Sequence, residues 1–258
     1  MKSALNTDGR KGPRWRYVYC IILSRKEQNF GPIGISGEDV YTVHYKDIAA
    51  VVSNSGDKSY EVLEHGITHQ KVVETVLKDF YIVPMGFGQV STEEDVKAFL
   101  NEDYYKLKGI LTKLEGKVEL GLKVMWKMDA ILREIVASND RIRILNKQIS
   151  SKPKQSTYQL RIELGRMVAA ELEKRGKRIT SEIYKKLGAI SVDSKENKQL
   201  SDAMILNAAF LVENEREEEF DEMVNTIEDE YREKVDMRYI VSPPYNFVDD
   251  LKSGRTIN

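Results

Sequence analysis

The chain has 258 residues, of which 41% are hydrophobic and 31% are charged, and its formal net charge is −1. A chain of this length is expected to form two domains of about 100–150 residues each. The near balance of charge argues against nucleic acid or a lipid membrane as a partner of the whole molecule. No apolar run approaches the ~20 residues that span a bilayer, and the single cysteine, Cys20, cannot form an internal disulfide. We therefore expect a cytoplasmic protein.

The first part of the chain has the pattern of an α+β domain over residues 15–115, preceded by a polar, flexible leader over residues 1–14. The β-rich run Arg16–Leu23 predicts a central strand, and further short strands are expected near residues 33–35, 40–45 and 48–53. Apolar residues at helical spacing predict a helix over residues 61–80. The next segment, residues 81–90, is expected to be extended, and Pro84 indicates that this strand either lies at an edge of its sheet or is broken there. A capping box that begins at Ser91 then predicts a helix that runs to Leu114.

The segment Lys117–Trp126 has an apolar residue at every second position, namely Val118, Leu120, Leu122, Val124 and Trp126. Because successive side chains of a strand point to opposite faces, this alternation predicts a strand with one face on a core. The other face carries Glu119, Gly121 and Lys123 and needs cover from water, another domain or a partner. We therefore take Glu119 and Lys123 as candidate partner-binding residues.

The remaining elements suggest a second domain over residues 116–242. Helices are expected over residues 131–136 and 160–187, and then a short strand at Ile190–Val192 with a polar turn after it. Residues 204–212 are apolar on both faces and predict a strand at the centre of the sheet. A helix over residues 214–231 and a strand over residues 236–241 follow. The order β-α-(α)-β-β-α-β is that of a ferredoxin-like domain.

The sequence contains only weak matches to motifs of metal-binding and nucleotide-binding sites. His65 and His69 have the i, i+4 spacing of two metal ligands, but Gly66 stands where a metalloprotease helix needs glutamate, and His44 is the only other histidine. Gly86-Phe87-Gly88 resembles part of a dinucleotide loop, but position 91 is serine rather than glycine. Helix-surface or buried-edge positions are the better interpretation for the histidines, and strand bending or close packing for the glycines, so we expect no metal, no cofactor and no catalytic site.

Two further segments are candidates for binding. The basic stretch Arg141–Lys154, with Arg141 and Arg143 at its start, could hold nucleic acid, but it lacks interleaved aromatic residues; a solvated loop or a protein-docking edge is favoured. The C-terminal tail, residues 243–258, carries Tyr245 and Phe247 after Pro243–Pro244. These aromatic side chains either pack back on their own body or insert into a partner.

Four segments in the same order resemble the gas vesicle accessory proteins of the GvpL/GvpF family, whose patterns read H-x-x-V…V-L-P-x-x-F-G-x-V, L-x-G-x-x-E-x-x-V-K-V, N-x-A-F-L-V and P-P-Y-S-F-V. Here they are Ile67–Gln70 with Ile82–Val90, Leu114–Val124, Asn207–Val212 and Pro243–Val248. The chain departs from the family pattern at Gly86, where an arginine is expected, and at Val241–Ser242 before the proline pair.

The resemblance implies a non-enzymatic protein that assists assembly of the gas vesicle shell, either as an assembly factor or as a minor structural component. It implies two α+β domains, the second a modified ferredoxin-like fold. The implied partners are the shell protein GvpA and other Gvp accessory proteins. The alternatives are a nucleic-acid-binding regulator, which would use the basic stretch, and a metal- or nucleotide-dependent enzyme, which would use the histidine helix.

Overall fold

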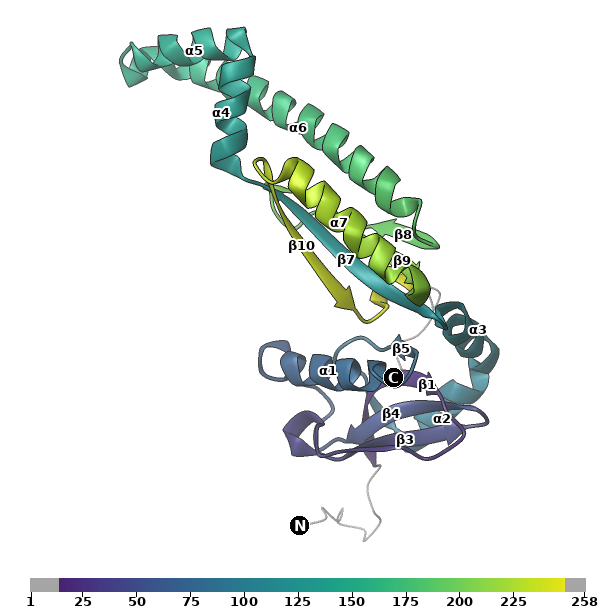
Figure 1. Ribbon diagram of the computed structural model, residues 1–258. Coiled ribbons are helices and arrows are strands. Elements are labelled where there is room, and N and C mark those ends of the chain that lie inside the picture. Colours follow the sequence, from purple (N-terminus) through teal and green to yellow (C-terminus); the bar gives the residue numbers. More distant parts are fainter. Residues whose placement is uncertain (1–13, 249–258) are drawn as a thin grey trace. The chain divides into compact units, whose positions relative to one another are not determined.

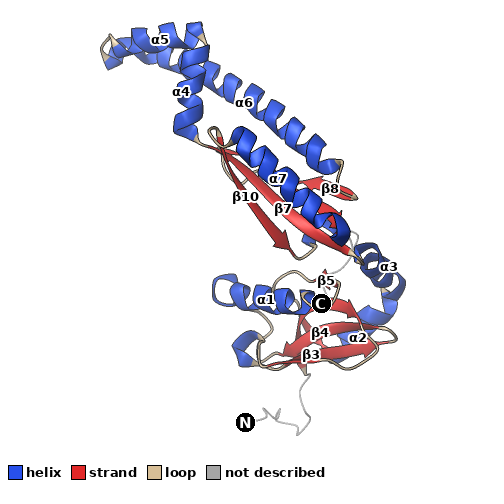
Figure 2. Ribbon diagram, in the orientation of Figure 1, coloured by secondary structure: helices blue, strands red, loops and turns tan. Residues whose placement is uncertain are grey.

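The computed structural model describes residues 14–248, so the expected leader, apart from Arg14, and residues 249–258 of the tail lie outside it. The chain forms two compact units of helices and strands and is an α+β protein (Figures 1 and 2). The first unit runs to Val118 and resumes at Ser242; the second comprises Glu119–Val241. The C-terminal segment after Ser242 thus belongs with the N-terminal elements.

The first unit is built on a six-stranded sheet of order β2-β3-β4-β1-β5, in which β6 also pairs with β1. All of the described pairings are antiparallel. β1 is central, pairs with β4 from Arg16 to Leu23 and is buried over most of its length, as the apolar run predicts. The strands are β1 Trp15–Leu23, β2 Asn29–Gly31, β3 Val40–Tyr45, β4 Ile48–Asn54, β5 Ile82–Pro84 and β6 Val90–Thr92.

Helices cover this sheet. α1 (Val62–Leu77) buries Val72, Val73 and Val76 against a core that includes Tyr17 and Tyr19 of β1. α2 (Glu93–Glu102) packs on β3 and β4, and α3 (Tyr104–Leu114) packs on β1 and β5. Because helices cover β1, its side chains from Tyr17 to Leu23 are apolar or aromatic without a break rather than alternating.

Three local expectations for the first unit are wrong. Residues 33–35 form no strand; they lead into a 3-10 turn, Ile35–Gly37, because the amide of Ile35 donates to the Tyr19 hydroxyl at 2.9 Å. The cap of α2 is Thr92 rather than Ser91, and its hydroxyl accepts from the amide of Asp95 at 3.1 Å. The expected single helix to Leu114 is interrupted at Asp103.

The second unit contains a four-stranded sheet of order β10-β7-β9-β8. β9 lies inside the sheet, which explains why its residues are apolar on both faces. In β7, Leu120, Leu122, Val124 and Trp126 are buried, as the alternation predicts. The strands are β7 Lys117–Trp126, β8 Asp193–Glu196, β9 Met204–Glu213 and β10 Val235–Ser242.

Two helices complete the core of the second unit. The long helix α6 (Tyr158–Gly188) and α7 (Glu217–Tyr231) both pack on β9 and on each other. Phe210 of β9 lies between Tyr184 of α6 and Phe220 of α7, with ring centroids 5.6 and 5.4 Å away. Short 3-10 turns occur at Lys154–Thr157, Asn214–Arg216 and, in the first unit, Tyr245–Phe247.

A helical projection extends the second unit beyond its sheet (Figure 1). It consists of α4 (Met128–Ser138), α5 (Asp140–Ser150) and the beginning of α6, which contact one another. Its small core contains Ile142, Leu145 and Ile149, which are 0%, 7% and 8% exposed. Along its 31 residues, about 46 Å of helix, α6 therefore joins the projection to the sheet.

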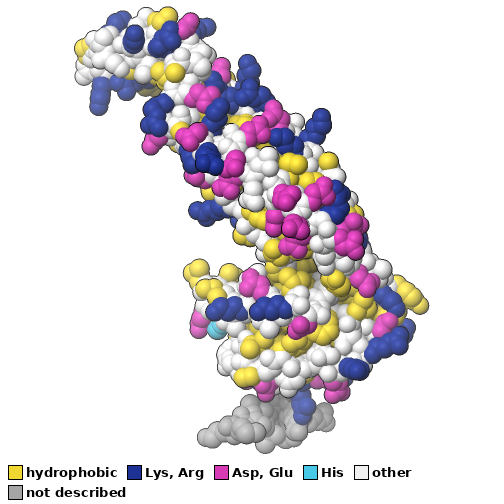
Figure 3. All heavy atoms as spheres, viewed as in Figure 1, with side chains coloured by type: hydrophobic (Ala, Val, Ile, Leu, Met, Phe, Trp, Pro, Cys, Tyr) yellow, Lys and Arg dark blue, Asp and Glu magenta, His cyan; other side chains and the backbone are white. Residues whose placement is uncertain are grey.

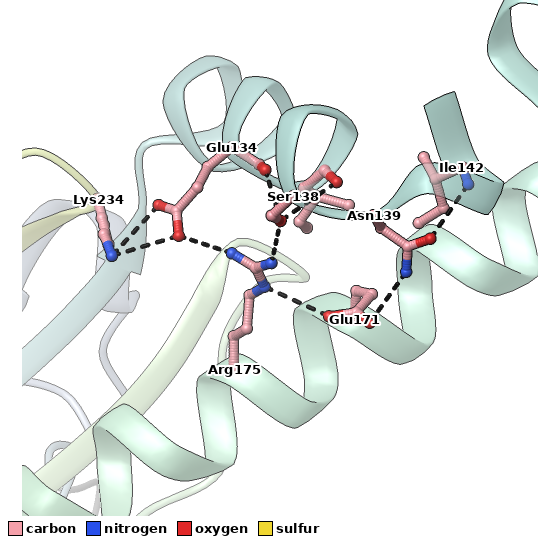
Figure 4. A network of polar contacts seen from close by, with 8 residues as sticks. Glu134, Ser138, Asn139, Ile142, Glu171, Arg175 and Lys234 are labelled. Carbon is pink, nitrogen blue, oxygen red and sulfur yellow. Dashed lines mark hydrogen bonds and ion pairs between the residues drawn. The ribbon is translucent and has the colours of Figure 1, made fainter. Parts of the chain in front are cut away.

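The projection is fixed by a polar network around Arg175 of α6 (Figure 4). The Arg175 guanidinium donates to Glu134 at 2.7 Å and to Ser138 at 2.6 Å, both on α4, and to Glu171 at 3.4 Å. Lys234, next to β10, pairs with the same Glu134 carboxylate at 3.3 Å. A single carboxylate thus links α4 to α6 and to the approach to β10.

Two expectations for the second unit are also wrong. The short strand is not Ile190–Val192 but β8, in the segment expected to be a polar turn. β8 is stabilised by backbone pairing with β9, from Asp193↔Leu211 to Glu196↔Ala208, which its polar sequence does not reveal. Residues 141–150, for which a solvated loop was one of two interpretations, lie in α5, so the loop interpretation is wrong there; Asn139 caps that helix by accepting from the amide of Ile142 at 3.2 Å.

Candidate partner-binding site

The N-terminal half of α1 presents apolar side chains to solvent. Val62 is 62% exposed, Leu63 is 97% exposed and Ile67 is 69% exposed. Single exposed apolar residues are normal on protein surfaces, whereas adjacent ones indicate an interaction site. Leu63 and Ile67 are one turn apart, so they share a stripe on the outer face of the helix.

These side chains border an open hollow of about 540 Å³ in the first unit. We call it the α1 hollow, and Figure 3 shows hydrophobic side chains gathered at the end of α1. It is lined by Val62, Leu63, Gly66, Ile67, His69, Gln70, Phe87 and Tyr245. Two of these residues come from outside α1: Phe87 precedes β6, and Tyr245 comes from the C-terminal segment. The site is therefore assembled from three parts of the chain.

A chain of neutral hydrogen-bonding groups runs beneath the hollow. The Tyr17 hydroxyl lies 3.0 Å from Nδ1 of His69, and the Tyr245 hydroxyl lies 3.4 Å from Nε2 of the same ring. The amide of Gly88 donates to the Tyr17 hydroxyl at 2.9 Å. Gly88 has φ +84°, a conformation that L side chains rarely adopt, so this glycine has a structural role in the turn.

Burial keeps these groups uncharged. It lowers the pKa of His69 to about 4, because the buried site deprives the protonated, charged ring of the hydration that it would have in water. Burial also raises the pKa of Tyr17 and of Tyr245. At neutral pH the lower wall of the hollow is therefore polar but uncharged. Such a surface can accept an apolar partner without leaving an unpaired charge.

The described part of the C-terminal tail packs on its own unit. Phe247 is 5% exposed, and Pro243 and Pro244 are also buried. Tyr245 is half-buried and forms part of the lining of the hollow. Of the two candidate aromatics, only Tyr245 offers surface to a ligand in this arrangement, whereas Phe247 anchors the segment.

The other candidate residues lie elsewhere. Glu119 is only 3% exposed, so of the three kinds of cover expected for this face of β7, water is not the one that covers Glu119, and Lys123 of the same strand is half-buried. Arg141 and Arg143 are exposed on α5, where they pair with Glu163 and Asp140. The structure brings none of these four residues into the α1 hollow.

The features considered for metal or nucleotide binding have structural partners. Both ring nitrogens of His69 face tyrosine hydroxyls, and His65 lies 3.6 Å from Glu64. Within residues 14–248, no group of three or more histidine, cysteine, aspartate or glutamate side chains is placed to hold a metal ion. None of the helices in that range has the length and hydropathy that crossing a bilayer requires.

The apolar spacing that predicts α1 does not separate Leu63 and Ile67 from the buried positions of the helix, and so it does not reveal the hollow. The sequence nevertheless contains a signal that distinguishes the exposed side of α1 from its buried side. The row that starts at Leu63 and Ile67 continues at four-residue spacing to Lys71 and Thr75, which are polar. The row from His69 continues to Val73 and is the buried one.

The fold and this site define a two-unit α+β protein whose clearest surface feature is a group of exposed apolar side chains beside the α1 hollow. The family model of the gas vesicle synthesis protein GvpL/GvpF matches residues 15–249. The chain belongs to this family, which confirms the resemblance carried by its motifs and gives it a role connected with gas vesicles.

Curated relatives are gas vesicle proteins, and solved structures of GvpF have a similar fold. The chain is 28% identical to gas vesicle protein F1 of Halobacterium salinarum, over 90% of this chain and 92% of that one. It is 28% identical to gas vesicle protein F of Haloferax mediterranei, over 93% and 98%. Its fold is similar to the crystal structure of GvpF from Anabaena sp., with a TM-score of 0.79 and 24% identity over 91% of this chain and 98% of that one. The GvpF structure from Microcystis aeruginosa gives a TM-score of 0.73, also at 24% identity.

Proposed function

We propose that this protein assists assembly of the gas vesicle shell in the cytoplasm by binding the shell protein GvpA, alongside other Gvp accessory proteins. The α1 hollow is the proposed binding site. The observation that carries the proposal is the exposure of Leu63 and Ile67, at 97% and 69%, beside the uncharged lining that Tyr245 and His69 provide.

The physical reason is that a shell subunit with apolar faces aggregates unless those faces are covered before assembly. Full burial of a valine, leucine or isoleucine side chain contributes about 1.5–3 kcal/mol. The loss of translational and rotational freedom on association, about 4–15 kcal/mol, offsets a large part of that gain. Three apolar side chains and an open hollow therefore suit transient holding of a subunit, which must later be released to the shell.

The double substitution Leu63→Lys and Ile67→Lys tests this proposal. It places two charges on the rim of the hollow, so the amount of GvpA that co-purifies should fall about tenfold or more, equivalent to ~1.4 kcal/mol. Stability should change by less than about 0.5 kcal/mol, because both positions are exposed. Vesicle formation in cells should fall in parallel.

The matched control replaces Val192 and Leu200 of the second unit, which are 52% and 69% exposed, with lysine. This variant adds the same charge and removes similar apolar surface away from the hollow, so GvpA capture should be retained. If the Leu63→Lys/Ile67→Lys variant captures GvpA as well as the control does, the α1 hollow is not the binding site.

Two finer points belong to the same proposal. We expect the second unit to be a modified ferredoxin-like domain; the sheet order β10-β7-β9-β8 supports this, with α6 and α7 both packed on β9.

We also expect the protein to act during assembly, with a minor structural place in the finished shell as the alternative. Quantification of the chain in washed, purified vesicles separates the two: a fixed ratio to GvpA would favour the structural role.

A further inference from the structure

The second unit separates its charges into two surfaces. The tip of its projection, residues 140–161, contains six basic residues and one acidic residue. Residues 213–230, which lead into and include most of α7, contain ten acidic residues and one arginine. Figure 3 shows acidic side chains gathered over α7 and basic ones around the projection. The net charge of −1 conceals this separation.

The outer face of α5 is both basic and apolar. Its inner face buries Ile142, Leu145 and Ile149. Arg143 and Lys147, one turn apart, therefore project outward with Ile144, which is 55% exposed. Beyond α5, Lys152 and Lys154 are also exposed. Lys147, Lys152 and Lys154 take part in no ion pair with any described residue.

The outer face of α7 is its electrostatic complement. Phe220, Val224, Ile227 and Tyr231 form the buried stripe of this helix. The exposed Glu218 and Glu222 stand on the opposite side, followed two turns later by Asp229. Asp229 pairs with Arg232, whereas Glu218 and Glu222 have no ion-pair partner within residues 14–248. Like charges at i, i+4 destabilise a helix, and a cationic partner would relieve that repulsion.

The two surfaces do not neutralise each other within one molecule. α5 packs on α4 and α6, whereas α7 packs on α6 and β9. Figure 1 shows the tip extending past α7 within this unit. The Arg175 network holds α4 against α6 and thereby fixes the direction of the projection (Figure 4). Each molecule therefore presents one basic and one acidic surface at the same time.

We propose that the protein self-associates head to tail, with the basic tip of one copy docked on the acidic face of α7 in a second copy. The contact uses two different surfaces, so each copy retains a free surface of each kind. Contacts of this type generate rings or open filaments rather than closed two-fold dimers. Ile144 supplies apolar area at the centre of the contact, and the surrounding charges set its orientation. The proposal does not depend on the α1 hollow.

Charge reversal on each side tests the proposal. The tip variant carries Lys147→Glu and Lys154→Glu, and the helix variant carries Glu218→Lys and Glu222→Lys. Sedimentation velocity over a range of protein concentrations at low ionic strength should show association of the wild type, which added salt weakens. Each variant alone should self-associate about tenfold more weakly or worse, because the two reversed side chains repel the unaltered surface that they face.

Three further samples make the result specific. An equimolar mixture of the tip and helix variants should associate, because the unaltered tip of the helix variant can dock on the unaltered α7 of the tip variant. The variant that combines all four substitutions should also associate, because the reversed positions of the tip then face reversed positions of opposite charge on α7. The control Lys71→Glu/Lys106→Glu, at exposed positions of the first unit, should behave as the wild type does. A monomeric wild type, or a mixture that fails to recover association, would overturn the proposal.

Discussion

The two units stabilise their surfaces in different ways. In the first unit, the wall of the α1 hollow rests on buried, uncharged groups, where Tyr17 and Tyr245 flank His69. In the second, the projection is fixed by partly exposed ion pairs, with Arg175 at the centre and Glu134 shared with Lys234. Buried neutral hydrogen bonds respond to protonation, whereas exposed ion pairs respond to salt. We therefore expect acid to destabilise mainly the first unit and salt to weaken mainly the projection of the second unit.

The largest expected effect is a loss of stability in the second unit alone, caused by a substitution in its core. Trp126 of β7 is 6% exposed and packs where α6 approaches closely: a Cβ added at Gly176 would lie 3.6 Å from its ring. Trp126→Ala should lower the free energy of unfolding of the second unit by about 3–5 kcal/mol. Hydrogen exchange should accelerate in α6 and β9 while α1 and β4 keep their protection. Equal loss of protection in both units would show that they unfold together, and a cost below ~1 kcal/mol would place Trp126 at the surface.

The next effect concerns acid and the first unit. The pKa of His69 is about 4 in the folded protein against an ordinary value of 6.5, so the unfolded chain binds more protons between these values. Stability contributed by the neutral ring is therefore complete above pH ~6.5 and is lost as the pH falls towards 4, by up to about 3 kcal/mol. Urea unfolding at a series of pH values, followed in the first unit by hydrogen exchange of α1 and β4, measures this loss.

The variant His69→Gln provides the comparison for that titration. Glutamine keeps one donor and one acceptor for the two tyrosine hydroxyls but does not titrate. Its unfolding free energy should depend less steeply on pH between 6.5 and 4 than that of the wild type. An unchanged slope would assign the acid sensitivity to other groups.

The smallest effect concerns salt and the second unit. Arg175→Met keeps much of the side-chain length but removes the donors to Glu134, Ser138 and Glu171. A cost of about 1–2 kcal/mol is expected, because these bonds are charge-assisted but partly exposed. Hydrogen exchange in α4 and α5 should accelerate. The exchange of the variant at low salt should resemble that of the wild type at high salt. The exchange of α1 serves as the internal control; faster exchange there would break the comparison between the units.

Much of the fold follows from local patterns. The alternation in Lys117–Trp126 predicts β7 and its buried face, and the apolar runs predict β1 and β9 inside their sheets. The four motif segments indicate the family from residue types and spacing alone, and the family model confirms it. These features are local because each depends on side chains that are neighbours along one element.

The elements that the sequence did not predict correctly, β8 and α5, depend on segments that are distant in the sequence. β8 has a polar sequence and forms because β9 supplies its backbone hydrogen bonds. The basic run has the composition of a loop or docking edge, but α5 forms there because its three apolar residues have the other helices of the projection to pack against. Only the tertiary environment distinguishes such segments from loops.

The candidate site shows the same division. Residue types alone show that an aromatic segment follows Pro243–Pro244 and that Leu63 and Ile67 lie in a helical segment. The packing of the fold buries Phe247, places Tyr245 on His69 beside the hollow and leaves Leu63 facing solvent. A residue's type fixes its chemistry, whereas the packing of distant segments decides which of its atoms water can reach.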